Sequence, residues 1–134
     1  MGKVVLGAIA PAGATLATSN FAFAGSVDLS ATATEANAQA VCRVAGTFSK
    51  LAININATGT SRVYKFRVNG ANGNQSVTAT DTTAGVYADN SNTDTLSAGD
   101  KFNYSTSSTG SPSAFWMRTV FEPTSGQANY YQKR

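Results

Sequence analysis

Apolar and polar residues alternate in short runs along the middle of the chain, between Gly46 and Thr106. The apolar positions of the three clearest runs are Leu51, Ile53, Ile55 and Ala57, then Tyr64, Phe66 and Val68, and then Phe102, Tyr104 and Thr106. A period of two places successive side chains on opposite faces of a β-strand, so that one face meets a core and the other meets water. We therefore predict three half-buried strands that share one core.

Glycine and asparagine separate these runs. The breaks fall at residues 57–60, 69–74 and 98–100. Both residue types adopt positive φ more readily than others, which makes them typical of tight turns. Short strands with turns about every 8–12 residues predict an all-β fold, and we expect an antiparallel β-sandwich.

Elements on either side complete this prediction. Residues 26–30 and 40–45 fit short strands, and residues 36–41 follow a capping-box pattern that fits one or two helical turns. The last strand, at 114–121, is apolar on both faces, which is typical of a central strand or of a subunit contact. We expect its single tryptophan, Trp116, in the core, with an anchor in an interface as the alternative.

The composition indicates one folded domain with a thin core. The chain has 134 residues, a net charge of only +3 and few large aliphatic residues. Low net charge argues against disorder, and a thin core predicts that neighbouring subunits help to bury apolar surface. We divide the chain into an extended N-terminal arm at 1–25, a sandwich domain at 26–124 and a polar tail at 125–134.

The arm is apolar and contains one charge, Lys3. A basic start followed by an apolar run resembles a secretory signal, but the run at 4–10 is short and Pro11 interrupts it. The segment is also too broken to span a membrane, so we predict no membrane contact. We expect the arm to be retained and to lie against other subunits. The candidate contact residues are Val5, Leu6, Ile9, Phe21 and Phe23 of the arm, together with Trp116 of the last strand.

The chain offers little for catalysis. It has no histidine, which excludes an imidazole base and a histidine metal site. Asp89 and Asp94 could meet as paired carboxylates, and residues 89–100 resemble a calcium loop. However, Asp94 stands where that loop needs glycine, and Asp100 is shorter than the expected Glu. We predict no enzyme, no catalytic residue, no cofactor and no metal.

Basic residues and the single cysteine add little. The nearest approach to a basic cluster is Arg62, Lys65 and Arg67, of which the last two share the polar face of a strand. Nucleic-acid binding needs more charge together with stacking aromatics, so we predict no nucleic-acid partner. Cys42 is expected to be a small buried residue, since no histidine can activate it, and an unpaired cysteine fits assembly in the cytoplasm.

Three segments carry a resemblance to a known group of proteins. They are Ala45–Leu51 (AGTFSKL), Lys65–Ala71 (KFRVNGA) and Asn92–Asp100 (NTDTLSAGD). Together they resemble the small β-sandwich domains of tailed-bacteriophage virion proteins, which include head decoration (cement) proteins and tail-fibre or spike tips. The resemblance covers residues 45–106 and implies a jelly roll, often trimeric, that binds through its surfaces and arms. No functional residue carries over, because the pattern has no fixed site.

Our first hypothesis is that the chain decorates and stabilises a phage capsid by binding the major capsid protein. It would then be a homotrimer on the virion surface, assembled in the host cytoplasm. One alternative is a small tail-fibre or baseplate adhesion protein. The other is a carbohydrate-binding module, which needs exposed aromatic residues. The candidates for that role are Tyr64, Tyr87, Tyr104 and Trp116, although Tyr64 and Tyr104 fit a core better.

Overall fold

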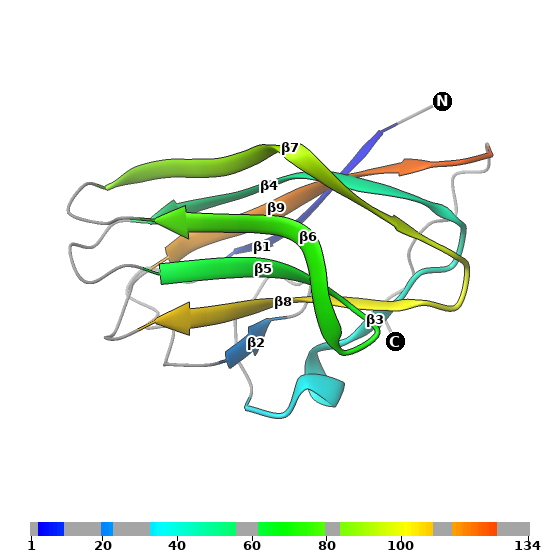
Figure 1. Cartoon of the computed structure of the whole chain (residues 1–134), viewed down its shortest axis with the longest axis horizontal. Coiled ribbons are helices and arrows are strands. Elements are labelled where there is room, and N and C mark those ends of the chain that lie inside the picture. The colour runs from blue at the N-terminus through cyan, green and yellow to red at the C-terminus, as the bar shows by residue number, and fades with distance from the viewer. Residues whose placement is uncertain are drawn as a thin grey trace.

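The computed structural model describes residues 3–9, 20–22, 33–55, 62–79, 84–108 and 114–125. These residues form strands and one short 3-10 helix (Figure 1). The elements are β1 Val4–Ile9, β2 Asn20–Ala22, η1 Glu35–Ala38, β3 Ala40–Val41, β4 Gly46–Ile55, β5 Arg62–Val68, β6 Ala71–Ala79, β7 Gly85–Leu96, β8 Lys101–Ser108 and β9 Ala114–Pro123. The all-β prediction is confirmed. Within the described residues, no helix could span a membrane.

The strands form two antiparallel sheets that face each other. The first sheet has the order β1-β9-β4-β7 and the second has the order β2-β8-β5-β6, with the short β3 also paired to β8. The outermost strands of the chain therefore pair with each other (β1 with β9, β2 with β8), and so do the inner ones (β4 with β7, β5 with β6). This is the strand order of a jelly roll, in which one long hairpin is rolled into two sheets. The predicted β-sandwich is confirmed.

The tip of that long hairpin is a two-residue turn. Asn69 and Gly70 both have positive φ, at 51° and 82°, and Val68 pairs directly with Ala71. Positive φ at both central residues defines a type I′ turn, which Asn-Gly favours because its twist matches that of the flanking strands. The predicted break at 69–74 is thus narrower than expected, since β6 begins immediately after Gly70.

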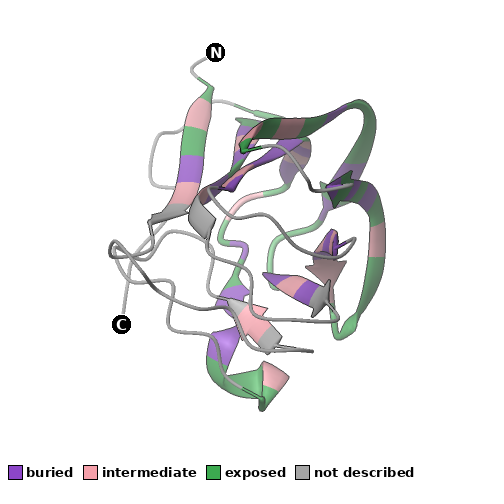
Figure 2. Ribbon diagram, turned by 90° about the vertical axis from the view of Figure 1, so that its left-hand side faces the viewer, coloured by how far each residue is buried: buried purple, intermediate pink, exposed green. Residues whose placement is uncertain are grey.

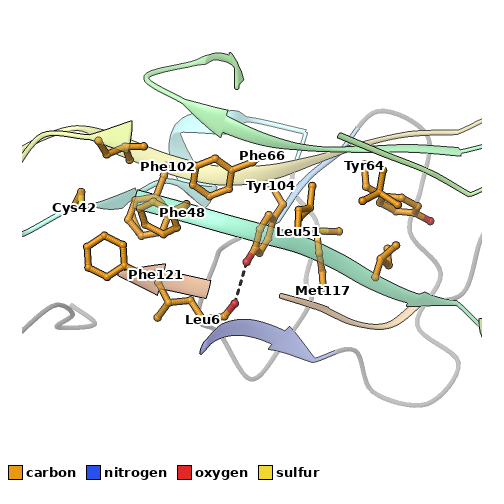
Figure 3. Close-up of a cluster of buried hydrophobic side chains, with 14 of the residues drawn as sticks. Leu6, Cys42, Phe48, Leu51, Tyr64, Phe66, Phe102, Tyr104, Met117 and Phe121 are labelled. Carbon is orange, nitrogen blue, oxygen red and sulfur yellow. Dashed lines mark hydrogen bonds between the residues drawn. The ribbon is translucent and has the colours of Figure 1, made fainter. Parts of the chain in front are cut away.

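Aromatic rings fill one end of the space between the sheets. The Phe48 ring lies 4.8 Å from the Phe66 ring and 4.7 Å from the rings of Phe102 and Phe121, measured between centroids. These four residues come from β4, β5, β8 and β9, so the rings join both sheets. Figure 3 shows Cys42 beside this aromatic end and Tyr64 at the opposite end of the same cluster.

The predicted arm is partly a component of the sandwich. β1 pairs with β9 in unbroken register from Val4 opposite Phe121 to Ile9 opposite Trp116. Along β1, Val5 is exposed and the next residue, Leu6, is buried (Figure 2), as expected of a sheet that has one face in the core. The Tyr104 hydroxyl reaches across from β8 and donates a hydrogen bond of 3.1 Å to a main-chain carbonyl of β1 (Figure 3). The prediction of a separate arm at 1–25 is therefore wrong for β1.

The other part of that segment with a described position is β2, which pairs with β8 in the second sheet. The rest of the predicted arm, and the strand predicted at 26–30, lie outside the described residues. The predicted helix at 36–41 is a shorter 3-10 turn, and the strand predicted at 40–45 is reduced to β3.

Candidate functional site

The residues predicted as contacts lie in different parts of the sandwich. Val5 is 60% exposed on the outer face of the first sheet. Leu6 is only 7% exposed and packs in the chain's own core, so it does not form part of a contact surface. Phe21 is half-buried on the outer face of the second sheet, where the Arg67 guanidinium lies 5.5 Å from its ring. Phe23 lies outside the described residues.

Trp116 lies on the same outer face as Val5. It is half-buried there, so its predicted place in the core is wrong, and its role as a contact stays a prediction. The register of the first sheet places Trp116 between Ile9 on β1 and Asn54 on β4, with Val86 next in the row on β7. One row of cross-strand neighbours therefore crosses all four strands.

The neighbouring row shows why Arg118 has space to pack against Trp116. Arg118 lies between Gly7 and Ala52, with Ala88 beyond Ala52. Small residues on both sides leave space for the long Arg118 side chain to lie along the sheet, and its guanidinium is 4.6 Å from the centroid of the Trp116 ring. A guanidinium over an indole ring is favourable and keeps both side chains close to the surface.

Apolar side chains are exposed at both edges of this face. Val86 on β7 is 57% exposed, close to the value for Val5 on β1, and Val120 on β9 is half-buried beside Val5. We call Val5, Val86, Trp116, Arg118 and Val120 the Trp116 face. Exposed apolar residues gathered on one side of a domain are typical of a surface that contacts another molecule.

On the outer face of the second sheet, other residues of the same chain pack against Arg67. The Arg67 guanidinium donates to both carboxylate oxygens of Glu35 on η1, over 2.8 and 2.9 Å, and also to Gly70 and Asn72 at the hairpin tip. The hydrogen bond from Arg67 lowers the pKa of Glu35. The positive charge of Arg67 is therefore neutralised, which weakens the basic stripe formed with Lys65. The absence of a nucleic-acid partner stays a prediction.

The segment that resembled a calcium loop is part of β7, and Asp94 faces the neighbouring strand β6. Its Oδ1 accepts from the main-chain N–H of Asn74 over 2.6 Å, and its Oδ2 accepts from the main-chain N–H of Gln75 over 3.2 Å and from the Gln75 side chain over 3.1 Å. Asp94 is 4% exposed. It therefore supplies hydrogen bonds that a further strand would otherwise give to the edge of β6.

Asp89, also on β7, likewise accepts hydrogen bonds from main-chain N–H groups, one of them on β6. Its oxygens accept from the main-chain N–H groups of Ser76, Ser91 and Asn92 and from the Asn92 side chain, over 2.9–3.1 Å. Burial raises the pKa of Asp89, but these hydrogen bonds outweigh it and lower the pKa to about 2. We call Asp89, Asp94 and Gln75 the β6–β7 corner. Its carboxylates hold two strand edges together, and the lowered pKa of Asp89 is the opposite of what a general acid needs.

The third acid of the supposed calcium loop lies elsewhere. Asp100 is in the turn between β7 and β8, where it accepts from the Asn69 side chain over 2.9 Å and from the main-chain N–H of Ser97 over 2.8 Å. Nowhere in the described part of the chain do three acidic or cysteine side chains gather as metal ligands would.

Gln75 extends the corner into the centre of the first sheet. Its side chain is fully buried, and its Oε1 accepts from the main-chain N–H of Leu51 over 3.0 Å. Leu51 follows Lys50, which has a φ of 56° and interrupts the ladders of β4 with β7 and β9. The amide of Gln75 thus satisfies a main-chain donor that this bulge removes from the ladder.

Cys42 is buried, as predicted. Its thiol donates to the Val44 carbonyl over 3.0 Å, and burial raises its pKa. A thiol with a raised pKa is a poor nucleophile, so Cys42 packs as a small core residue.

One group that was not predicted from the sequence is a buried arginine, Arg62, at the end of the core away from Cys42. Arg62 is 2% exposed, and its Nε and Nη1 have no hydrogen-bond partner among the described residues. The hydroxyl of Tyr64 and that of Thr106 are likewise buried without a partner there. The signal was present in the sequence, because Arg62 lies two positions before Tyr64 and so falls on the apolar side of the alternation, away from Lys65 and Arg67.

Comparison with known proteins assigns the chain to no family. A scan against models of protein families finds no match, and a search of curated proteins also finds none. The strand order and the described surfaces therefore carry the functional argument.

Proposed function

We propose that this chain is a structural virion protein of a tailed phage, which decorates and stabilises the capsid shell by binding the major capsid protein. The observation that carries the proposal is the jelly-roll strand order, β1-β9-β4-β7 against β2-β8-β5-β6. Jelly rolls are found in viral capsid proteins, in lectins and in cupins. A chain without histidine lacks the imidazole ligands and bases on which many metal enzymes depend, which favours a binding or structural role.

The Trp116 face is the surface that we assign to this contact. It combines exposed valines at two edges of one sheet with the central pair of Trp116 and Arg118. Tryptophan and arginine are the residues most enriched among those that dominate binding energy in interfaces. Binding would bury apolar area at about 25 cal/mol per Å², repeated over many identical sites of a shell. Self-association, as in the trimers implied by the resemblance, would add to this avidity.

Two other functions remain as alternatives. A tail-fibre or baseplate adhesion protein would use the same fold at another place in the virion. A carbohydrate-binding module is favoured by one observation, the half-buried Trp116 ring beside Asn54 on an open sheet face. Tyr64 and Tyr104 are both fully buried, which leaves few exposed aromatic rings for a sugar to stack on.

Copy number tests the proposed function directly. Quantitative mass spectrometry of purified virions would compare this chain with the major capsid protein. Hundreds of copies in a simple ratio to the capsid protein are expected of a decoration protein. A few copies to a few dozen would favour the tail, and none at all would overturn the virion proposal and favour glycan binding.

A matched pair of substitutions tests the assigned surface. Val86→Asp places a charge in the Trp116 face, whereas Val41→Asp places one on β3 of the other sheet, where Val41 is also exposed, at 43%. Because an unpaired carboxylate is costly to bury, we expect Val86→Asp to reduce binding to capsid shells about tenfold or more. Val41→Asp is expected to bind as the wild type does. Equal binding by both variants would exclude the Trp116 face as the contact.

A further inference from the structure

The end of the core that contains Arg62 is built from facing positions of β5 and β8. Arg62 and Tyr64 lie two residues apart on β5, so both side chains leave the strand on its inner face. Thr106 on β8 is the direct cross-strand neighbour of Tyr64. All three are buried, at 2%, 0% and 3% exposure.

The polar atoms at this end are mostly hydrogen-bond donors, and the two hydroxyl oxygens can also accept. Nε and Nη1 of Arg62 are N–H donors only, and the hydroxyls of Tyr64 and Thr106 can each donate one hydrogen bond. None of these atoms makes a hydrogen bond of good geometry to a described residue, although the Arg62 guanidinium is close enough to Tyr64 to act against the rise in its pKa. Leaving one such donor unsatisfied is costly, and three side chains leave them unsatisfied together in one place.

Among the described residues, no carboxylate is paired with the positive charge of Arg62 either. The acids of the described residues are all engaged elsewhere: Glu35 with Arg67, Glu122 with Lys3 over 3.1 Å, and Asp89, Asp94 and Asp100 with N–H donors. Tyr64 does not serve, because burial raises its pKa and the neighbouring guanidinium offsets this only in part. A buried guanidinium keeps its charge, because arginine is too basic to be deprotonated in proteins.

We propose that Arg62, Tyr64 and Thr106 form a binding site for one small oxyanion, of the size of phosphate or of a single carboxylate group. The anion would accept hydrogen bonds from the guanidinium and from both hydroxyls, and it would neutralise the buried charge. This site is inside the sandwich and is independent of the Trp116 face and of the proposed function.

Thermal unfolding with inorganic phosphate as the probe tests the site. Phosphate is varied at pH 7 while the ionic strength is held constant with a salt of the bulky HEPES anion. A ligand that binds only the folded protein raises Tm along a saturating curve, and we expect a rise of roughly 3–5 °C near saturation. Phosphate also stabilises proteins by exclusion from their surface, but that effect does not saturate. Acetate, titrated in the same way, tests a carboxylate.

Arg62→Met removes the charge and keeps an unbranched apolar side chain. This variant is expected to lose the saturating response. In phosphate-free buffer it is expected to be at least as stable as the wild type, because replacing an uncompensated buried charge by an apolar group is neutral or stabilising. The matched control is Arg67→Met on the same strand, which loses the Glu35 ion pair and therefore some stability but keeps the saturating response.

Phosphorus NMR gives a second readout, and its result for the wild type does not depend on whether a variant folds. Wild type and Arg67→Met are expected to broaden the phosphate signal, whereas Arg62→Met leaves it sharp. The proposal is overturned if wild type shows neither a saturating Tm rise nor broadening. It is also overturned if Arg62→Met unfolds many degrees lower in phosphate-free buffer, since the chain itself must then supply the counter-charge. Asp28→Asn and Asp81→Asn would in that case identify the acid that does so.

Discussion

The β6–β7 corner and the Arg62 end of the core both bury charge, and they satisfy it differently. Asp94 receives three hydrogen bonds, all from two adjacent residues of β6. Arg62 is buried to the same extent and receives no acceptor for two of its nitrogens within the described residues. The edge of a sheet offers spare N–H groups to an acid, whereas the inner face of a strand offers a cation no spare carbonyl oxygen. Main-chain and side-chain donors of β6 satisfy the buried acid, whereas the described residues supply no acceptor for two nitrogens of the buried cation.

Removing the Asp94 carboxylate should have the largest effect. Asp94→Ala leaves the main-chain N–H groups of Asn74 and Gln75 and the Gln75 amide without their acceptor at a buried place. We expect the free energy of unfolding to fall by about 3–5 kcal/mol, measured by urea denaturation. Asp100→Ala, at an exposed turn, is the control and should lose much less. Equal losses would mean that the buried carboxylate of the β6–β7 corner stabilises the fold no more than an exposed one does. Arg62→Met, in contrast, should lose nothing in phosphate-free buffer.

Gly73→Ala should have the next largest effect. A Cβ at this position would lie 2.6 Å from Oδ1 and 2.8 Å from Cγ of Asp94, so the carboxylate or the strand must move. We expect a loss of about 1–3 kcal/mol in the free energy of unfolding. The control is Gly7→Ala, whose Cβ would meet no atom closer than the Met117 carbonyl oxygen at 3.4 Å. Because the two residues share one contact, Gly73→Ala combined with Asp94→Ala should cost less than the sum of both; strict additivity would contradict this explanation.

Asp89 should produce the smallest of the three effects, visible as a dependence on pH. Its pKa is about 2 in the folded protein and about 3.9 in an unfolded chain. A pKa that is lower in the folded state adds stability above the unfolded value, and this stability is lost as the pH falls through the folded value. The difference between the two pKa values corresponds to at most about 2.6 kcal/mol, which solvent screening reduces to about 1–2 kcal/mol. Wild type and Asp89→Asn should therefore converge in unfolding free energy between about pH 5 and pH 2. A difference that stays constant across this range would show that the ionised carboxylate is not what stabilises the corner.

Strands could be predicted from the sequence where their inward-facing side chains are apolar. The alternation at residues 51–55, 64–68 and 102–106 gave β4, β5 and β8, and the Asn69–Gly70 turn followed from residue type. β6 and most of β7 were missed because their inward positions include Gln75, Asp89 and Asp94, which read as loop residues. The period of two is present in these strands, but their inner face carries hydrogen-bonded polar residues beside the apolar Val77 and Leu96.

The candidate surfaces were less predictable because they depend on strand order. Val5 and Val86 are on opposite edges of one sheet, and no local pattern relates them. The Trp116 face follows from the pairing of β1 with β9, which the sequence does not encode in any short segment. The burial of Arg62 could have been predicted, because the alternation along β5 places it on the same face as Tyr64 and Phe66. It was instead grouped by charge with the outward-facing Lys65 and Arg67.

Pairing the first strand with the last also sets the order in which the chain can fold. Among the described strands, only β5 and β6 pair residues that are close in sequence, and each further pair closes a longer loop. Folds dominated by such distant pairings form slowly. We therefore expect β5 and β6 to pair first, around the turn at Asn69 and Gly70, and the longer-range pairs to form later during synthesis. β1 would stay unpaired until β9 has left the ribosome. The Trp116 face would then be completed in the final step, so a partly made chain would have no surface with which to bind a partner too early.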